Sequence, residues 1–187
     1  MKYSDSSAGI ALKQYRIVLF KEIFRKTIHL CSAMVPTLLA IAYWPVIGLL
    51  VFALSGYCLS EYVRFKGIEV PVISKITTIA ARKRDENKVV FGPITLVIGI
   101  ISAALLWNLE AARIGIYALS FGDGFASLVG KMIGRVHIPF TNGKTAAGSL
   151  SCFIAVFISS FCVCQNASVA LILAVIATVV EVIPLTD

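Results

Sequence analysis

Six apolar stretches, separated by polar or basic segments, constrain this chain more than any other feature of its sequence. They cover roughly residues 28–43, 46–62, 89–107, 114–130, 149–164 and 167–184. With 58% hydrophobic residues and a mean hydropathy of +0.89, the 187-residue chain has more apolar surface than a soluble domain can bury. We therefore predict an all-α polytopic membrane protein with about six transmembrane helices, which form a single transmembrane domain over residues 1–187.

The segments outside these stretches predict smaller elements. Residues 1–9 are polar and unpatterned, which favours disorder. Residues 10–24 mix apolar and basic side chains, as in an amphipathic helix lying at the membrane interface. A short cytosolic helix is expected between the second and third stretches. Pro36 and the Gly122–Gly124 segment are expected to kink or interrupt their helices.

The distribution of basic residues predicts how the chain crosses the membrane. Of the 17 Lys and Arg residues, all but Arg113 lie before the first stretch, between the second and third, or between the fourth and fifth. Lys and Arg concentrate in cytoplasmic loops, so we expect a multi-pass protein of the cell membrane with both termini in the cytoplasm. Basic loops between spans explain the net charge of +7 without nucleic acid as a partner.

Asp123 is an acidic residue inside the fourth apolar stretch, where a charged side chain is not expected. It lies between Gly122 and Gly124 in a run that is otherwise apolar from 114 to 129. A carboxylate at membrane depth costs about 2.5 to 3.5 kcal/mol on insertion scales, so its default interpretation is functional. The flanking glycines allow a loosened backbone and close approach of a ligand.

Residues 131–148 form the expected cytosolic nucleotide-binding loop. Flexible glycine amides and cations are what a polyphosphate needs, and a nearby carboxylate can hold the Mg²⁺ that accompanies a nucleotide. A P-loop is not expected, because Ile138 stands where that motif needs glycine. The predicted nucleotide-binding residues are Gly122, Gly124, Lys131, Arg135, Gly143, Lys144, Thr145, Gly148 and Ser149, with Asp123 as the metal ligand.

Two further groups of charged residues are predicted to form a rim around the nucleotide-binding site. Arg25, Lys26 and His29 share one helical face. Their alternative interpretation is that the two cations extend to the lipid headgroups and the histidine is an interior residue. The second group precedes the third stretch and is alternatively a solvated loop; it comprises Arg82, Arg84, Glu86 and Lys88.

Several motifs together resemble the CTP-dependent lipid kinases, a family that comprises dolichol kinase, phytol kinase and the CTP-using diacylglycerol kinase. The resemblance extends from Lys21 to the end of the chain. Its most specific part is the block GDGFAS followed by GKTAAGS. The motifs in chain order are KEIFRKTIHL, RKRDENKVVFGP, FGDGFASLVGKMIGR, GKTAAGSL and EVIPLTD. The family pattern continues into a further short apolar segment, which this sequence does not contain.

The resemblance implies an enzyme that transfers the γ-phosphate of CTP to the hydroxyl of a lipid alcohol. Asp123 would then hold Mg²⁺ on the CTP phosphates, and Lys144 with the surrounding amides would bind them. Lys131 and Arg135 would add positive charge. His29, Glu86 and Asp123 itself are open as the group that accepts the hydroxyl proton. The expected partners are CTP, a lipid substrate and the bilayer, and a homodimer is left open.

Two other functions compete with this one. The same block is similar to part of phosphatidate cytidylyltransferase, which makes CDP-diacylglycerol, although that enzyme's C-terminal signature is absent here. A small transporter is the third candidate, because Asp123 would suit a proton or cation path. No inverted repeat is visible in the sequence to support it.

Overall fold

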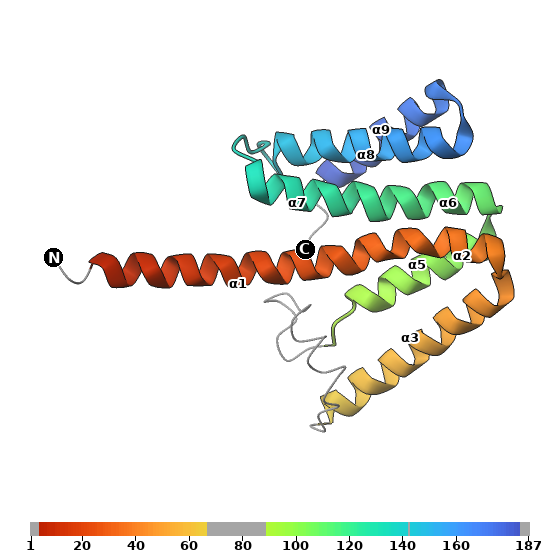
Figure 1. Ribbon diagram of the computed structural model, residues 1–187, viewed down its shortest axis with the longest axis horizontal. Helices are drawn as coiled ribbons and strands as arrows, with labels where there is room; N and C mark the ends of the chain where they lie inside the picture. The colour runs from red at the N-terminus through yellow and green to blue at the C-terminus, as the bar shows by residue number, and fades with distance from the viewer. Residues whose placement is uncertain (1–3, 67–88, 142, 184–187) are drawn as a thin grey trace.

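The computed structural model describes residues 4–66, 89–141 and 143–183, and its regular elements within these ranges are all helices (Figure 1). The backbone also pairs at an isolated bridge between His137 and Thr145. The prediction of an all-α chain is thus confirmed for the described residues. The cytosolic helix expected between the second and third apolar stretches lies outside them.

The chain begins with a long helix, α1, from Ser4 to Cys31. It includes residues 4–9, part of the stretch expected to be disordered. A 3₁₀ turn, η1 (Ser32–Met34), separates it from the short helix α2 (Val35–Ile41). Pro36 lies in the first turn of α2, where its missing N–H removes no helical hydrogen bond. The interruption predicted near Pro36 is therefore confirmed, as the start of a new helix.

Two apolar helices, α3 (Tyr43–Phe65) and α5 (Gly92–Leu106), pack together beside α2. The Tyr43 hydroxyl donates a 2.7 Å hydrogen bond to the carbonyl of Ala104 in α5. A small core joins the three helices and consists of Leu39, Ile47 and Ala104.

The buried carboxylate of Glu61 fastens the end of α3 to the start of the α5 segment. Glu61 accepts hydrogen bonds of 2.7 and 3.0 Å from Arg64 and one of 3.1 Å from the backbone N–H of Val90. A buried carboxylate is stable only when its oxygens are paired in this way. Glu61 therefore holds together the two chain segments that flank residues 67–88.

The next three elements form one almost continuous rod: α6 (Leu109–Tyr117), the π-helix η3 (Ala118–Asp123) and α7 (Gly124–Ile133). A π-helical turn holds more residues than an α-helical one, and such turns are frequent at functional sites. The interruption predicted around Gly122–Gly124 is thus present as a widened helical turn, without a break in the rod.

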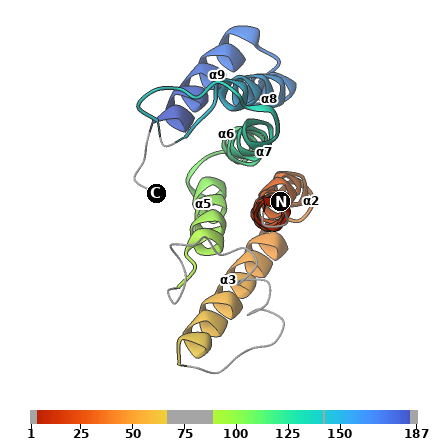
Figure 2. The same ribbon diagram turned by 90° about the vertical axis from the view of Figure 1, so that its left-hand side faces the viewer.

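A helical hairpin, α8 (Ala146–Cys164) and α9 (Ala167–Val182), covers this rod. Figure 2 shows α8 and α9 on one side of α6 and α7, with α3 and α5 on the other side. The buried residues between the rod and the hairpin are Ala126, Cys152, Val156 and Ala174. Helix α1 packs along α7 and η3, so the first and fourth apolar stretches of the sequence lie side by side.

Among the described residues, two helices are long and apolar enough to cross a bilayer, Tyr43–Arg64 and Ala146–Cys164. The apolar helices Gly92–Leu106 and Ala167–Val182 are shorter. Large apolar side chains on these helices are exposed; Phe52, for example, has 77% of its surface accessible. The structure therefore supports two of the six predicted spans by length and composition, and the complete six-span arrangement stays a prediction.

Candidate functional site

Asp123 is the last residue of η3 and lies where the π-helix meets α7. Its side chain is 38% exposed, so the carboxylate is accessible to a ligand. The neighbouring glycines permit close helix packing. A Cβ at Gly122 would lie 2.9 Å from Val156 Cγ2, and one at Gly124 would lie 3.0 Å from Leu30 Cδ2.

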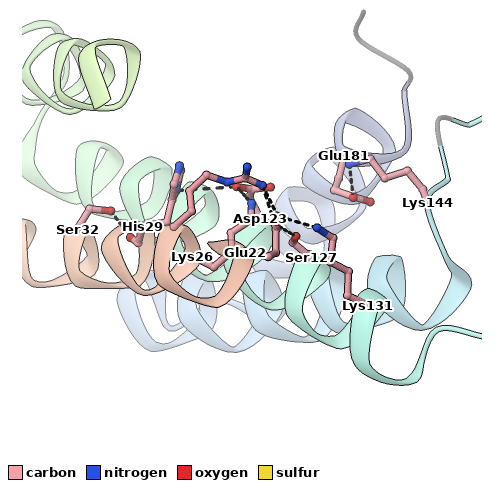
Figure 3. A network of polar contacts seen from close by, with 10 residues as sticks. Glu22, Lys26, His29, Ser32, Asp123, Ser127, Lys131, Lys144 and Glu181 are labelled. Carbon is pink, nitrogen blue, oxygen red and sulfur yellow. Dashed lines mark hydrogen bonds and ion pairs between the residues drawn. The ribbon is translucent and has the colours of Figure 1, made fainter. Parts of the chain in front are cut away.

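Lys26 and His29, two of the three residues predicted to share a face of α1, face this carboxylate (Figure 3). The Lys26 ammonium, on a buried side chain, donates a 2.5 Å hydrogen bond to Asp123 Oδ2, and His29 Nδ1 lies 3.9 Å from the same oxygen. Both of these contacts involve Asp123 Oδ2. The structure therefore brings Lys26 and His29 together with Asp123 across 97 and 94 positions of sequence.

A second acid, Glu22, continues this polar interface between α1 and α7. Ser127 Oγ donates a 2.5 Å hydrogen bond to Glu22 Oε1, and Lys131 Nζ lies 2.6 Å from Oε2. Arg25 of the same helix binds both oxygens at 2.6 and 2.7 Å. Burial raises the pKa of the Glu22 carboxyl, but hydrogen bonds from Lys131 and Ser127 and the charge of Arg25 lower it, to about 2. Glu22 is therefore ionised at neutral pH.

Sequence reasoning missed Glu22 and Ser127, although their spacing contains a signal. Glu22 and Lys26 are four residues apart, and so are Asp123 and Ser127. Residues at this spacing share one face of a helix. Each face carries an acid that contacts a residue of the other helix. The two helices therefore pair along their length through complementary polar faces. The pairing also neutralises Lys131, which was predicted to act on a nucleotide.

The interface continues toward the middle of the apolar region through two serines. Ser32 and Ser120 lie 2.6 Å apart between their hydroxyl oxygens, and Ser32 also donates to the carbonyl of His29. Ser120 is fully buried in η3. Hydroxyls buried in apolar surroundings need such partners, so this pair fixes the register of α1 against η3 next to Asp123.

The glycines of the predicted loop serve mainly to let helices α7 and α8 approach each other. Thr145 caps α8 by accepting a hydrogen bond from the N–H of Gly148, and its side chain fills the space beside Gly130 and Gly134. A Cβ at Gly148 would lie 2.7 Å from the carbonyl oxygen of Ala126. Gly143 is different: it has a φ of +79° and open space around its Cα.

We expect Gly134→Ala to destabilise the protein, because the added Cβ would meet the carbonyl oxygen of Gly130 and lie 2.7 Å from Thr145 Cβ. Overpacking of this kind costs about 1 to 3 kcal/mol. Gly115→Ala is the matched control, since nothing lies within 4 Å of its Cβ position in α6. The melting temperature in detergent should fall for the first variant and stay or rise for the second.

Lys144 lies immediately before the cap of α8 and is bound by an acid from α9. Its ammonium is 2.6 Å from Glu181 Oε1, and Ser149 Oγ donates a 3.2 Å hydrogen bond to Glu181 Oε2. Glu181 thus holds the predicted phosphate-binding lysine (Figure 3).

The remaining predicted residues fall into two groups. Arg135 is exposed in the segment between α7 and α8, and this segment begins at Gly134 because Lys131 still belongs to the last turn of α7. The second group lies outside the described residues and comprises Arg82, Arg84, Glu86 and Lys88.

The donors around Asp123 fit a magnesium nucleotide better than a metal held by protein ligands alone. Within the described ranges, no group of three or more His, Cys, Asp and Glu side chains is placed to hold a metal ion. Magnesium bound to a nucleotide needs only one or two carboxylates, because phosphate oxygens and water complete its coordination. The partly exposed carboxylate of Asp123 satisfies that requirement, and the cations nearby suit the phosphates.

The fold and the site together define an all-helical apolar protein with a charged site between its helices. An uncharacterised protein of Methanocaldococcus jannaschii is 31% identical over 137 residues, which cover 72% of this chain and 68% of the relative. A probable phytol kinase 1 of rice is 31% identical over 139 residues, covering 65% of this chain and 44% of the relative. Phytol kinase 1 of Arabidopsis thaliana is 26% identical over 203 residues, covering 92% and 61%.

Further plant phytol kinases and a farnesol kinase of Arabidopsis thaliana match at 27 to 32% identity. Over most of its length the chain is similar to phytol kinases, and over 43% of its length to a farnesol kinase, which supports the lipid kinase family that its motifs predicted. It spans between 44 and 67% of the length of the phytol kinases. No family model and no solved structure matches the chain. The relation to phosphatidate cytidylyltransferase stays a prediction.

Proposed function

We propose that this protein is a membrane kinase that transfers the γ-phosphate of CTP to the hydroxyl of a lipid alcohol of the polyprenol, phytol or diacylglycerol type. The observation that carries the proposal is the accessible Asp123 carboxylate, which faces Lys26 and His29 between α1 and η3. The names of the relatives, phytol kinase and farnesol kinase, support an apolar alcohol as the acceptor.

The charges of the site suit phosphoryl transfer, which depends mainly on positioning and on neutralisation of phosphate oxygens. Asp123 would hold Mg²⁺ through its partly exposed carboxylate, and the metal would supply charge neutralisation for the phosphates. Lys144 and Arg135 would bind phosphate oxygens from the loop side. Lys26 would keep the Asp123 side chain in place, because the pair excludes other orientations of the carboxylate.

The acceptor hydroxyl would approach from the bilayer, with its tail left among the exposed apolar side chains. His29 and Asp123 are the described candidates for receiving the hydroxyl proton, and Glu86 is a further candidate outside the described residues. His29 lies on α1 with 21% of its side chain exposed. Its Nδ1 lies 3.9 Å from Asp123 Oδ2.

We further propose that six helices span the cell membrane with both termini in the cytoplasm. Asp123, Lys144 and the loop beginning at Gly134 would then face the compartment that contains nucleotides. The basic residues along α1 and Lys131 in the last turn of α7 support this orientation. Trp107 and the exposed Glu110 would lie at the opposite interface.

The function is tested by incubating membranes that contain the full chain with CTP or ATP labelled in the γ-phosphate and a panel of lipid alcohols. Transfer of the label from CTP to a lipid, with release of CDP, is the expected result. Release of pyrophosphate with phosphatidate as substrate would instead identify a cytidylyltransferase. Ion movement in liposomes without nucleotide binding would identify a transporter and contradict the proposal.

Lys144→Ala is expected to weaken CTP binding by about tenfold or more, because it removes a charge-assisted hydrogen bond to phosphate. Equilibrium binding of labelled CTP to the purified protein measures the effect. Glu110→Gln is the matched control, since Glu110 is exposed in the first turn of α6 at the far end of the rod. An unchanged affinity of the Lys144 variant would place the phosphates elsewhere, and a large loss in the Glu110 variant would reverse the proposed orientation.

A further inference from the structure

Glu181 is an acid in the last turn of an otherwise apolar helix, α9. Its side chain is only 11% exposed, and a buried carboxylate is costly unless it is paired. It is paired twice, at 2.6 Å with Lys144 Nζ and at 3.2 Å with Ser149 Oγ. Its two partners flank the start of α8, 37 and 32 positions earlier in the chain.

The contact determines the direction of the Lys144 side chain. A lysine side chain has four rotatable bonds and loses rotational freedom when it is fixed. The 2.6 Å contact with Glu181 fixes it in advance and engages one of three N–H donors. The side chain is still 35% exposed, so its other donors are accessible to a ligand.

We propose that Glu181 is a positioning residue that holds Lys144 in the orientation in which it binds the nucleotide phosphates. This inference rests on the proposed function. A lysine and a glutamate from different elements form an ion pair of this kind in protein kinases, where the pair must be in place for the lysine to act on the phosphates. Here the acid comes from α9, and the lysine lies immediately before the cap of α8.

Two other roles for Glu181 predict different results. An acid that competes with phosphate for Lys144 would weaken nucleotide binding, so its removal would tighten it. An acid that binds Mg²⁺ directly would act independently of Lys144, so the effects of changing the two residues would multiply. A positioning residue acts only through Lys144, so its effect disappears once Lys144 is gone.

The experiment is a double-mutant cycle on the full chain in detergent or nanodiscs, with the Kd of labelled CTP as the readout. Glu181→Gln is expected to raise the Kd about tenfold, the size of a charge-assisted hydrogen bond that is no longer formed. Lys144→Ala and the double variant are expected to share one Kd. The midpoint of a Mg²⁺ titration at saturating CTP should be unchanged in Glu181→Gln.

The inference is overturned if Glu181→Gln binds CTP as well as or more tightly than the wild type, if the two effects multiply, or if the Mg²⁺ midpoint moves. Melting temperatures establish that the variants are folded. If Glu181→Gln does not fold, Glu181→Asp is tested instead, because aspartate keeps the charge on a shorter side chain. We then expect a Kd for CTP between those of the wild type and Lys144→Ala, and this change should disappear when Lys144 is also substituted. Wild-type protein that binds no CTP would instead refute the proposed function.

Discussion

Asp123→Asn is expected to abolish phosphoryl transfer, with a loss of at least about 100-fold, comparable to removal of a main electrostatic group from an active site. Asparagine keeps the shape of the side chain but removes the negative charge that would hold Mg²⁺. Its amide oxygen can still accept the hydrogen bond from Lys26, which lies 2.5 Å from Oδ2 in the wild type. The variant should therefore fold.

The measurement is the rate of label transfer from γ-labelled CTP to the best lipid alcohol, together with the melting temperature. Ser127→Ala is a suitable control, because Ser127 contacts Glu22 one helical turn after Asp123. That variant should lose only part of its stability and keep most of its activity. Wild-type activity in Asp123→Asn would exclude Asp123 as the metal ligand, whereas loss of folding would show that its charge is needed structurally.

Lys26→Met is expected to have the largest effect on stability. Lys26 is 3% exposed, and methionine fills most of its volume without its charge. Removing one partner of a buried ion pair costs about 3 to 5 kcal/mol, because the other charge is left uncompensated. Asp123 is 38% exposed, so water and His29 can compensate part of that charge, and we expect about 2 kcal/mol.

A second substitution separates stability from activity in this variant. The double variant Lys26→Met/Asp123→Asn has neither charge, so it should recover much of the melting temperature that Lys26→Met loses. It should remain inactive, since the metal ligand is absent. If the double variant is less stable than either single variant, the two residues do not stabilise the fold as a pair.

The charged faces show how far sequence reasoning reached. An acid within an apolar run identified Asp123, and helical spacing grouped Lys26 with His29. The structure places these residues together, and it adds Glu22 and Ser127 to them. Glu22 was missed because an acid beside Lys21 and Arg25 resembles an ordinary interfacial charge. Only the packing of α1 on α7 removes it from water.

The structure gives the glycines of the predicted loop a different role from the one that the sequence indicated. Flexible glycine amides are predicted to bind phosphate, but Gly130, Gly134 and Gly148 each lie where a Cβ would meet Thr145 or an adjacent backbone atom. Composition alone does not distinguish a glycine that bends the chain from one that lets two helices touch. Gly143, with its positive φ, is the glycine whose backbone conformation requires that residue type.

Helical class, apolar character and family followed from local information, because hydrophobic composition, helix breakers and short motifs are properties of neighbouring residues. The pairing of opposite charges did not follow from local information. Lys131 pairs with Glu22 and Lys144 with Glu181, over separations of 109 and 37 positions. Such pairs depend on which helices are adjacent and on the register between them. Side-chain packing between distant segments determines both, and no local sequence pattern encodes that packing.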